Sequence, residues 1–362
     1  MLADINAEMG YEMVLALGAF LLSMFLTPIY TTIAYKYKWW KKQKRVAVTG
    51  EELTVMNKLH EKKISRKFPT MAGMIFLVSI ATVTLICNLT RGETWLPLAA
   101  FVGGGLIGLI DDMINISQNK AVAGLRAPVK FAMISIVGLV LGWFFAIKLG
   151  WTIVKIPFIG SWNLESGIIG GATINIPNVG SITLGAIAMI LLFAFAIVAT
   201  SNAVNISDGL DGLAGGLAMI AYGAFAVIAL LEEQWHLAGF CFAVTGALLS
   251  YVWFNVFPAR FMMGDTGSFA LGAGLGVVAM MTNTFFLLPI ICLLFVVEAG
   301  SSLLQIISKK FFGRKIFISA PIHHHLQAKG WEESKIVMRF WVIGGVMALI
   351  GIFMAMQGVI TG

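Results

Sequence analysis

Long apolar runs constrain the fold of this chain more than any other feature. Ten of them have the approximately 20 residues that a helix needs to cross a hydrocarbon core of about 30 Å. Their approximate bounds are 12–35, 70–90, 94–110, 128–149, 181–201, 213–231, 236–257, 267–283, 284–307 and 336–358. Hydrophobic residues make up 59% of the 362 residues and charged residues only 12%, which excludes an ordinary soluble domain. The sequence predicts a single all-α polytopic membrane domain over residues 1–362, with about ten transmembrane helices.

The basic residues predict the orientation of these helices. Of the 25 lysines and arginines, 22 lie in the segments that follow odd-numbered runs. The positive-inside rule makes those segments cytoplasmic and both termini periplasmic. The predicted cytoplasmic loops lie near 36–69, 111–127, 202–212, 255–266 and 308–335. A basic face beside anionic headgroups explains the net charge of +7 without nucleic acid as a partner.

One segment on the opposite side differs from the other loops. Residues 151–185 alternate apolar and polar side chains between glycines and prolines, which predicts a short periplasmic β-hairpin near 151–180. The acidic start, MLADINAEMGYEM, has no basic region typical of a signal peptide, so we expect the first run to be a permanent span. The three cysteines are far apart in apolar stretches and predict neither a disulfide framework nor a zinc site.

Five polar clusters border the apolar runs, and the predicted topology places all five on the cytoplasmic side. The first holds Asp111 and Asp112 in the motif GLIDD. An aspartate at the centre of a span costs about 2.5–3.5 kcal/mol and usually has a function. Two solvated loop carboxylates are the alternative. Gly104 and Gly108, four residues apart, favour close helix packing rather than phosphate binding.

The second cluster is the motif NAVNISDGLDGLAGG. Asn202, Asn205, Asp208 and Asp211 recur every three residues, so that neighbours in the series share a helix face. Amides and carboxylates among glycines suit hydrogen bonds to a sugar or a base, or a magnesium site. The alternative is a capping turn, which explains one aspartate but not four polar residues.

The third and fifth clusters also have structural alternatives. Asn255, Arg260 and Asp265 lie in WFNVFPARFMMGDTGS, and the aspartate of GDTGS occupies a position where a helix N-cap is equally expected. In the fifth cluster, Arg66 and Thr70 border the second run. Together with Lys67 they predict contact with lipid headgroups or with the phosphate of a lipid substrate.

The fourth cluster, APIHHHLQAKGW, contains three of the five histidines of the chain. His323, His324 and His325 cannot all point in one direction, so at most two of them can reach a common substrate. Metal-ligand spacing and an accompanying cysteine are missing from the motif, so zinc has little support. Near carboxylates and lysines, the imidazoles favour phosphate handling. Together the five clusters indicate Mg²⁺-dependent chemistry on a phosphate at the inner membrane face.

Several motifs carry a resemblance to a known family. They are FPTMAG, GLIDD, NAVNISDGLDGLAGG, NVFPARFMMGDTGS, VVEAGSSLLQI and APIHHHLQAKGWEESKIVMRFW, and they extend over residues 68–341. The chain resembles the phospho-N-acetylmuramoyl-pentapeptide transferases of the polyprenyl-phosphate N-acetylhexosamine-1-phosphate transferase superfamily. The resemblance implies a homodimer in the bacterial inner membrane with a cytoplasmic active site. It also implies transfer of phospho-MurNAc-pentapeptide from UDP-MurNAc-pentapeptide to undecaprenyl phosphate, giving lipid I and UMP in peptidoglycan synthesis.

The resemblance further implies roles for individual residues. Asp265 would ligate Mg²⁺, while Asp111 and Asp112 would act on the lipid phosphate or help to position the metal, with His323 beside the diphosphate. The resemblance leaves two mechanisms open, direct attack by the lipid phosphate and a covalent aspartyl intermediate. We favour direct attack, with Asp111 as base or orienting group. Glu298 is a further candidate contact. The implied substrate contacts are Thr70, Lys130, Asn205, Asp208, Gly209, Leu210, Asp211, Asn255, Phe261, Gln305, His324 and His325.

Three departures from the family pattern bear on these roles. Ala72 replaces a glycine in PTMAG, and Asn115 stands where a lysine is usual. Met262 stands where an aromatic ring that stacks on uracil is expected, and Phe261 would point about 100° away on a helix. Two other functions stay open: a sibling transferase that uses UDP-GlcNAc, and a transporter of lipid-linked sugars. The histidine block argues against the sibling, and the lack of internal repeats argues against the transporter.

Overall fold

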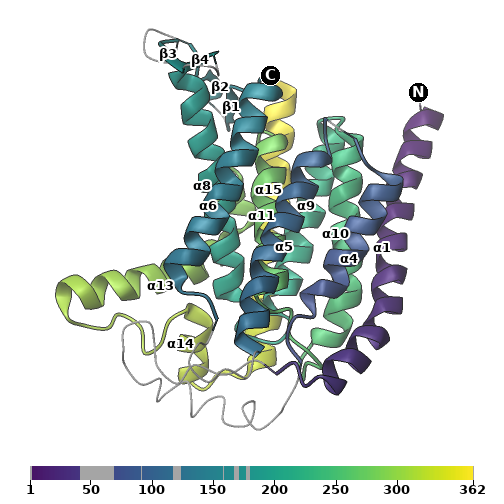
Figure 1. Cartoon of the computed structure of the whole chain (residues 1–362), viewed down its shortest axis with the longest axis vertical. Helices are drawn as coiled ribbons and strands as arrows, with labels where there is room; N and C mark the ends of the chain where they lie inside the picture. The colour runs from purple at the N-terminus through teal and green to yellow at the C-terminus, as the bar shows by residue number, and fades with distance from the viewer. Residues whose placement is uncertain are drawn as a thin grey trace.

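The computed structural model describes residues 2–40, 69–90, 92–116, 124–157, 159–166, 171–176 and 180–361. The chain forms a bundle of helices with a small β-structured extension (Figure 1). The long helices are α1 (Leu2–Lys36), α4 (Gly73–Cys87), α5 (Trp95–Ile116), α6 (Ala127–Trp143), α8 (Leu184–Ser207), α9 (Leu213–Leu231), α10 (Trp235–Asn255), α11 (Gly264–Met281), α13 (Leu293–Phe312) and α15 (Glu333–Thr361). The short elements are η1 (Phe144–Lys148), α12 (Leu288–Ile291), α14 (Ile322–Ala328), β1 (Ile153–Ile156), β2 (Gly160–Asn163), β3 (Thr173–Ile176) and β4 (Gly180–Thr183). Arg66 and Lys67 of the fifth predicted cluster lie outside the described residues.

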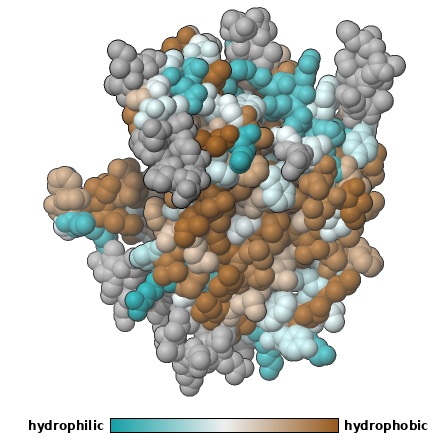
Figure 2. Space-filling model, turned by 45° about the horizontal axis from the view of Figure 1, so that its top comes forward, coloured by the Kyte–Doolittle hydropathy of each residue, from teal (hydrophilic) through white to brown (hydrophobic). Residues whose placement is uncertain are grey.

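Seven helices in the described part of the chain are long and apolar enough to cross a membrane. They cover Met9–Lys36, Trp95–Ile116, Ala127–Lys148, Leu184–Ser207, Leu213–Leu231, Trp235–Asn255 and Glu333–Gln357. Figure 2 shows hydrophobic side chains across the middle of the visible face, with more hydrophilic residues toward both ends. Such a continuous apolar surface needs lipid around it. The chain is therefore a multi-pass membrane protein made mainly of helices, as the sequence predicts.

Helix α11 occupies the centre of the bundle. All 18 of its residues are buried, and it packs against α5 and α8. Glycines make these contacts close, because a β-carbon added at Gly104 would lie 2.5 Å from the carbonyl oxygen of Phe269. A β-carbon at Gly276 would likewise lie 2.8 Å from the hydroxyl of Thr200 on α8. Small residues that let backbones approach are the usual basis of helix packing in membranes.

The predicted ninth span differs from the observed helix. Residues 284–307 are not one continuous helix, since the short α12 ends at Ile291 and α13 begins at Leu293. Pro289 lies in the first turn of α12, where its missing N–H is tolerated. Helix α13 then continues to Phe312 and carries Lys309 and Lys310 in its last turn. In Figure 1 it extends sideways from the bundle, next to α14.

The segment predicted to form one hairpin contains two antiparallel strand pairs. Strand β1 pairs with β2, and β3 pairs with β4. The first pair is attached to the bundle through Lys155, whose ammonium lies 3.0 Å from both carboxylate oxygens of Glu232. The backbone N–H of Lys155 donates to Oδ1 of Asn283 at 2.9 Å. Both chain ends lie at the same end of the bundle as the strands, and α14 lies at the opposite end (Figure 1).

Candidate active site

Three aspartates meet where the end of α5 crosses the start of α11. Asp111, Asp112 and Asp265 are 2%, 0% and 5% exposed. One carboxylate oxygen from each lies within 4.8 Å of the others. Asp111 and Asp112 are adjacent on α5, while Asp265 comes from the first turn of α11. The structure therefore brings together the aspartates of the first and third predicted clusters, which are more than 150 residues apart.

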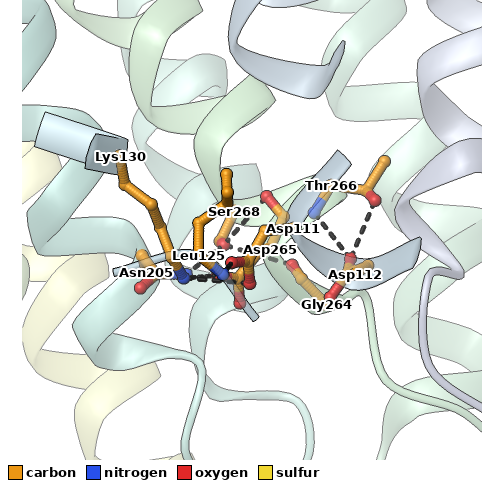
Figure 3. Close-up of polar contacts among 9 residues, drawn as sticks. All are labelled: Asp111, Asp112, Leu125, Lys130, Asn205, Gly264, Asp265, Thr266 and Ser268. Atoms are coloured by element: carbon orange, nitrogen blue, oxygen red, sulfur yellow. Dashed lines mark hydrogen bonds and ion pairs between the residues drawn. The ribbon is translucent and has the colours of Figure 1, made fainter. Parts of the chain in front are cut away.

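A lysine from a third helix lies between two of these carboxylates (Figure 3). The Nζ atom of Lys130, near the start of α6, is 2.5 Å from Oδ2 of Asp265 and 2.9 Å from Oδ2 of Asp111. The other oxygen of Asp111 accepts a hydrogen bond from the backbone N–H of Leu125 at 2.6 Å. Asp111 is thus held both by a charged partner and by the backbone.

Asp112 is held by the start of α11. Its Oδ2 atom accepts hydrogen bonds from the backbone N–H of Thr266 at 2.9 Å and from the Thr266 hydroxyl at 2.8 Å. Helix α11 begins after Met263, whose apolar side chain cannot cap the free N–H groups of the first turn. A carboxylate from α5 therefore provides the capping hydrogen bond. The capping role considered for Asp265 is filled by Asp112, and the Asp265 carboxylate contacts Lys130 instead.

The donor set fits a hard divalent cation. Magnesium and similar ions prefer carboxylate oxygens, whereas softer metals select imidazole and thiolate. Three carboxylates and one ammonium leave two negative charges unbalanced among these four side chains. Burying unbalanced charge is expensive, so a bound divalent cation would stabilise the cluster.

The second predicted cluster lies next to the aspartates. The Asn205 amide, in the last turn of α8, donates to the hydroxyl of Ser268 at 2.8 Å. Ser268 in turn donates to the carbonyl of Gly264 at 3.1 Å, on the first turn of α11 (Figure 3). Asn205 therefore joins the end of α8 to the turn that carries Asp265. Asp208 follows as the C-cap residue of α8.

The turn between α8 and α9 is held by two other parts of the chain. The Asp211 carboxylate accepts from the backbone N–H of Ala259 at 3.0 Å, while its own N–H donates to Oε1 of Glu333 at 2.7 Å. Leu210 is 1% exposed and anchors the turn in the core. The residues from Asp208 to Gly212 are therefore fixed by the loop after α10 and by the start of α15.

Gly212, the next residue of this turn, is held by one residue of α10 and one of α15. Its N–H donates to Oδ1 of Asn255 at 3.0 Å, and its carbonyl accepts from the indole of Trp341 at 3.1 Å. The Asn255 amide group donates onward to the carbonyl of Phe261 at 2.8 Å. Gly212 has φ +81°, which a residue with a side chain rarely adopts. Asn255, predicted as a substrate contact, is engaged with backbone groups in this structure.

His323 packs against the turn between α8 and α9. It is fully buried in α14, and its Nδ1 lies 2.8 Å from Oε2 of the equally buried Glu298 on α13. The far edge of its ring packs on Gly209, so closely that a β-carbon on that glycine would overlap Nε2. The Glu298 carboxylate thus orients an imidazole against the turn that follows α8.

The other two histidines have different partners. His324 is 6% exposed, and its Nδ1 lies 2.9 Å from Oε1 of Gln327 in the same helix. Nδ1 of His325 accepts a hydrogen bond from the N–H of Ile318 at 3.2 Å. Partial burial and the charge of Lys329 lower the pKa of His325, in agreement with a ring nitrogen that accepts a hydrogen bond. The prediction that the three rings cannot share one direction is confirmed.

Gln305, another predicted substrate contact, is occupied by a loop. Its Oε1 accepts from the N–H groups of Ile316 and Phe317 at 3.0 Å, and its Nε2 donates to the carbonyl of Phe317 at 2.9 Å. The amide therefore bridges α13 to the segment that precedes α14. These three hydrogen bonds of Gln305 all go to backbone groups of that segment.

Phe261 and Thr70 are both buried in the core. Phe261 is fully buried, with its ring 5.7 Å from Tyr30 and 5.9 Å from Tyr251 and from Phe254. Its ring packs in an aromatic cluster and is not open to a ligand here. Thr70 is 2% exposed, and its carbonyl accepts from the Tyr30 hydroxyl. The Thr70 hydroxyl faces Gly264 on the same side as the Asp112 carboxylate.

Besides Ser268, four contributors to the site were not assigned a role from the sequence. They are the N–H of Leu125, the Thr266 hydroxyl, the Glu333 carboxylate and the Trp341 indole. Thr266 follows Asp265 in GDTGS, so a polar residue in the first turn was visible as a signal. A backbone donor such as Leu125 leaves no signal in a side-chain pattern.

The fold and the aspartate cluster define a polytopic membrane protein with a buried acidic centre whose oxygen atoms suit a divalent cation. The profile of glycosyl transferase family 4 matches residues 94–283. A phospho-N-acetylmuramoyl-pentapeptide-transferase from Anoxybacillus flavithermus is 35% identical over 340 residues, 92% of this chain and 95% of the relative. The protein of that name from Levilactobacillus brevis is 38% identical over 302 residues, covering 81% and 85%. That from Clostridium novyi is 37% identical over 340 residues, covering 92% and 94%.

The chain therefore belongs to glycosyl transferase family 4 and, within it, to the phospho-N-acetylmuramoyl-pentapeptide transferases. The resemblance identified from the motifs is confirmed, since the similarity extends over nearly the whole chain. The sequence motifs that form the aspartate cluster, GLIDD and GDTGS, both fall inside the matched residues 94–283.

Proposed function

We propose that the enzyme transfers phospho-MurNAc-pentapeptide from UDP-MurNAc-pentapeptide to undecaprenyl phosphate, releasing UMP and forming lipid I. The observation that carries this proposal is the buried cluster of Asp111, Asp112 and Asp265 in a membrane protein whose relatives carry this transferase name. The reaction is a step of peptidoglycan synthesis, which links it to cell-wall biogenesis, cell shape and division.

We propose Mg²⁺ as the cofactor, held by Asp265 with Asp111 and Asp112 as further ligands. The ion would offset the negative charge of two phosphate-bearing substrates and of the transferred group. This proposal is supported by the hydrogen bonds that already hold the two carboxylates, from the start of α11 to Asp112 and from the N–H of Leu125 to Asp111. Such prior orientation reduces the reorganisation needed on binding.

The transfer is a displacement at phosphorus. An oxygen of undecaprenyl phosphate attacks the phosphorus nearest the sugar, and the bond from that phosphorus to the bridging oxygen of UMP breaks. A phosphate has a second pKa of about 6, so the attacking group is mostly dianionic near neutral pH and needs no obligatory base. We therefore propose direct attack with Asp111 as the orienting carboxylate. A trapped phospho-aspartyl enzyme would contradict this mechanism.

We propose that the remaining site residues bind the donor. Lys130 and His323 provide positive charge and hydrogen-bond donors for the diphosphate. The turn from Asp208 to Asp211, with Asn205, holds the uridine and the adjoining sugar. This proposal is supported by the position of His323, whose ring packs on Gly209 in that same turn. His324, His325, Thr70, Asn255, Phe261 and Gln305 are proposed as further contacts that would depend on rearrangement when substrate binds.

We propose the bacterial inner membrane as the location, with the active site on the cytoplasmic face. Ten transmembrane helices would place both termini and both strand pairs in the periplasm. The charge asymmetry of the loops supports this orientation. We also expect a homodimer, which light scattering of the purified protein in detergent tests directly.

The test is UMP release by the purified protein with undecaprenyl phosphate and Mg²⁺. UDP-MurNAc-pentapeptide and UDP-GlcNAc are compared as donors, and Asp265→Asn is the matched control. We expect UMP from the muramoyl donor alone, loss when EDTA is added, and loss of most activity in a folded Asp265→Asn protein. Release from UDP-GlcNAc alone would assign the chain to a sibling transferase. Release from neither donor by folded protein would instead support a lipid-linked sugar transporter.

A further inference from the structure

The positively charged ammonium of Lys130 lies within the aspartate cluster that is proposed to bind the metal. The ammonium lies between Asp265, at 2.5 Å, and Asp111, at 2.9 Å, and both contacts use the Oδ2 atoms. The same two carboxylates belong to the set whose ligand atoms converge within 4.8 Å. The ammonium therefore contacts carboxylates that a divalent ion would also have to contact.

An ammonium and a divalent ion cannot share this place without strong repulsion. A magnesium ion needs carboxylate oxygens at about 2.0–2.1 Å and keeps an octahedral shell around itself. The side chain of Lys130 is 18% exposed and those of Asp111 and Asp265 are 3% and 7% exposed, so little water screens the two positive charges. Binding of the metal therefore requires Lys130 to move away from Asp265.

The surrounding contacts allow this movement without loss of the site. Asp111 keeps its hydrogen bond from the N–H of Leu125, and Asp112 keeps its two hydrogen bonds from Thr266. Neither anchor involves Lys130. The lysine itself lies near the start of α6, on a flexible four-carbon stem that can place its charge elsewhere.

We propose that Lys130 is an internal counter-cation of the metal site. In the metal-free enzyme it holds Asp111 and Asp265 together against their mutual repulsion, and the arriving metal displaces it from Asp265. Competition between the ammonium and the metal sets the metal affinity of the enzyme and leaves the displaced ammonium free for an anionic group of the substrate. This inference rests on the divalent-cation site in the proposed function.

The experiment is a titration of the full-length protein in detergent with Mn²⁺, followed by electron paramagnetic resonance of the free ion. Lys130→Met removes the charge and keeps most of the side-chain length. We expect it to bind Mn²⁺ about 10-fold more tightly or better than the unaltered protein, because the competing charge is gone. Lys130→Arg keeps the positive charge and should bind Mn²⁺ about as weakly as the unaltered protein. Lys155→Met, which alters an ion pair outside the site, should leave the affinity unchanged.

Thermal unfolding gives a second readout that does not depend on activity. Without metal, Lys130→Met should unfold at a lower temperature than the unaltered protein. Saturating Mn²⁺ should raise the unfolding temperature of Lys130→Met by more than it raises that of the unaltered protein. If Lys130→Met does not fold, Lys130→Gln replaces it in both measurements. Equal or weaker Mn²⁺ binding by the charge-removing variant would overturn the proposal.

The metal site and the counter-cation role of Lys130 predict different outcomes for these variants. If Mn²⁺ binds the unaltered protein and is lost in Asp265→Asn, the metal site stands whatever Lys130 does. If Lys130→Met then matches the unaltered protein, only the counter-cation role is overturned. If neither the unaltered protein nor Lys130→Met binds Mn²⁺, the metal assignment in the proposed function is overturned, and the counter-cation role with it.

Discussion

The α-carbon of Gly108 lies directly against the backbone carbonyl of Asp265. A β-carbon added at Gly108 would come far closer than 3.0 Å to that oxygen, a distance that real contacts of this kind essentially never show. The contact fixes the spacing of α5 and α11 one turn before Asp111 and Asp112. The absence of a side chain at Gly108 therefore allows the two helices to come close enough for the three aspartates to meet.

We expect Gly108→Ala to force α5 and α11 apart and to lower kcat by about 100-fold, since displacements near 1 Å have effects of that size. Overpacking of this kind typically costs about 1–3 kcal/mol of stability. The measurements are UMP release and thermal unfolding of the purified variant. Gly103→Ala on the same helix is the control, because its β-carbon would meet Val137 at an ordinary 3.4 Å. Equal activity of the two variants would contradict the spacing role.

Thr266 makes a second testable contribution, since its hydroxyl donates to Asp112 beside its own backbone N–H. Thr266→Val keeps the shape of the side chain and removes the donor. We expect about 1.5–3 kcal/mol of lost stability, typical of a hydrogen bond to a charged group, together with weaker Mn²⁺ binding. Thr266→Ser restores the hydroxyl and should recover most of both properties. A valine variant that binds Mn²⁺ as tightly as the serine variant would exclude this role.

Glu298 should act through His323 rather than on the substrate. We expect Glu298→Leu to release the imidazole and to lower kcat by about 10-fold or more, whereas Glu298→Gln keeps an oxygen that accepts from Nδ1 and retains more activity. The decisive comparison is a double-mutant cycle with His323→Ala. If the two residues form one unit, the double variant is no slower than His323→Ala alone. Simple addition of the two losses would show that Glu298 acts independently.

The orientation in the membrane can be tested with single cysteines. The background is Cys87→Ser, because Cys87 is exposed while Cys241 and Cys292 are buried. Trp162→Cys lies on β2, where the side chain is 59% exposed. We expect a membrane-impermeant maleimide to label it in intact cells, and to label Arg314→Cys after permeabilisation only. Reversed labelling would overturn the proposed topology.

The sequence predicted the helices and the aspartate cluster well, for a physical reason. A span needs a long apolar run, and burying a carboxylate there is expensive, so both features leave strong local signals. Asp111, Asp112 and Asp265 stand out because each departs from the surrounding apolar pattern. The break before α13 gave a weaker signal, since an apolar run looks the same whether the helix continues or ends at Cys292.

The partners of the polar residues were much harder to predict. The family resemblance implied that the amides of Asn255 and Gln305 contact the substrate, but in the structure they satisfy backbone groups of neighbouring turns and loops. A buried backbone N–H or carbonyl needs a partner as strongly as a substrate does, and composition does not distinguish the two demands. The same limit applies to Lys130, since its contact with Asp265 spans 135 residues of sequence.

The contacts that α15 makes with the turn between α8 and α9 have a consequence for biosynthesis. Glu333 and Trp341 hold Asp211 and Gly212, and both lie on α15, 122 and 129 residues further along the chain than their partners. Proteins emerge from the ribosome N-terminus first, so the helices that carry the aspartates are inserted before these two residues exist. A nascent chain would therefore lack this support for the turn between α8 and α9 until α15 has been synthesised. Synthesis and docking of α15 would then be the step that fixes this turn.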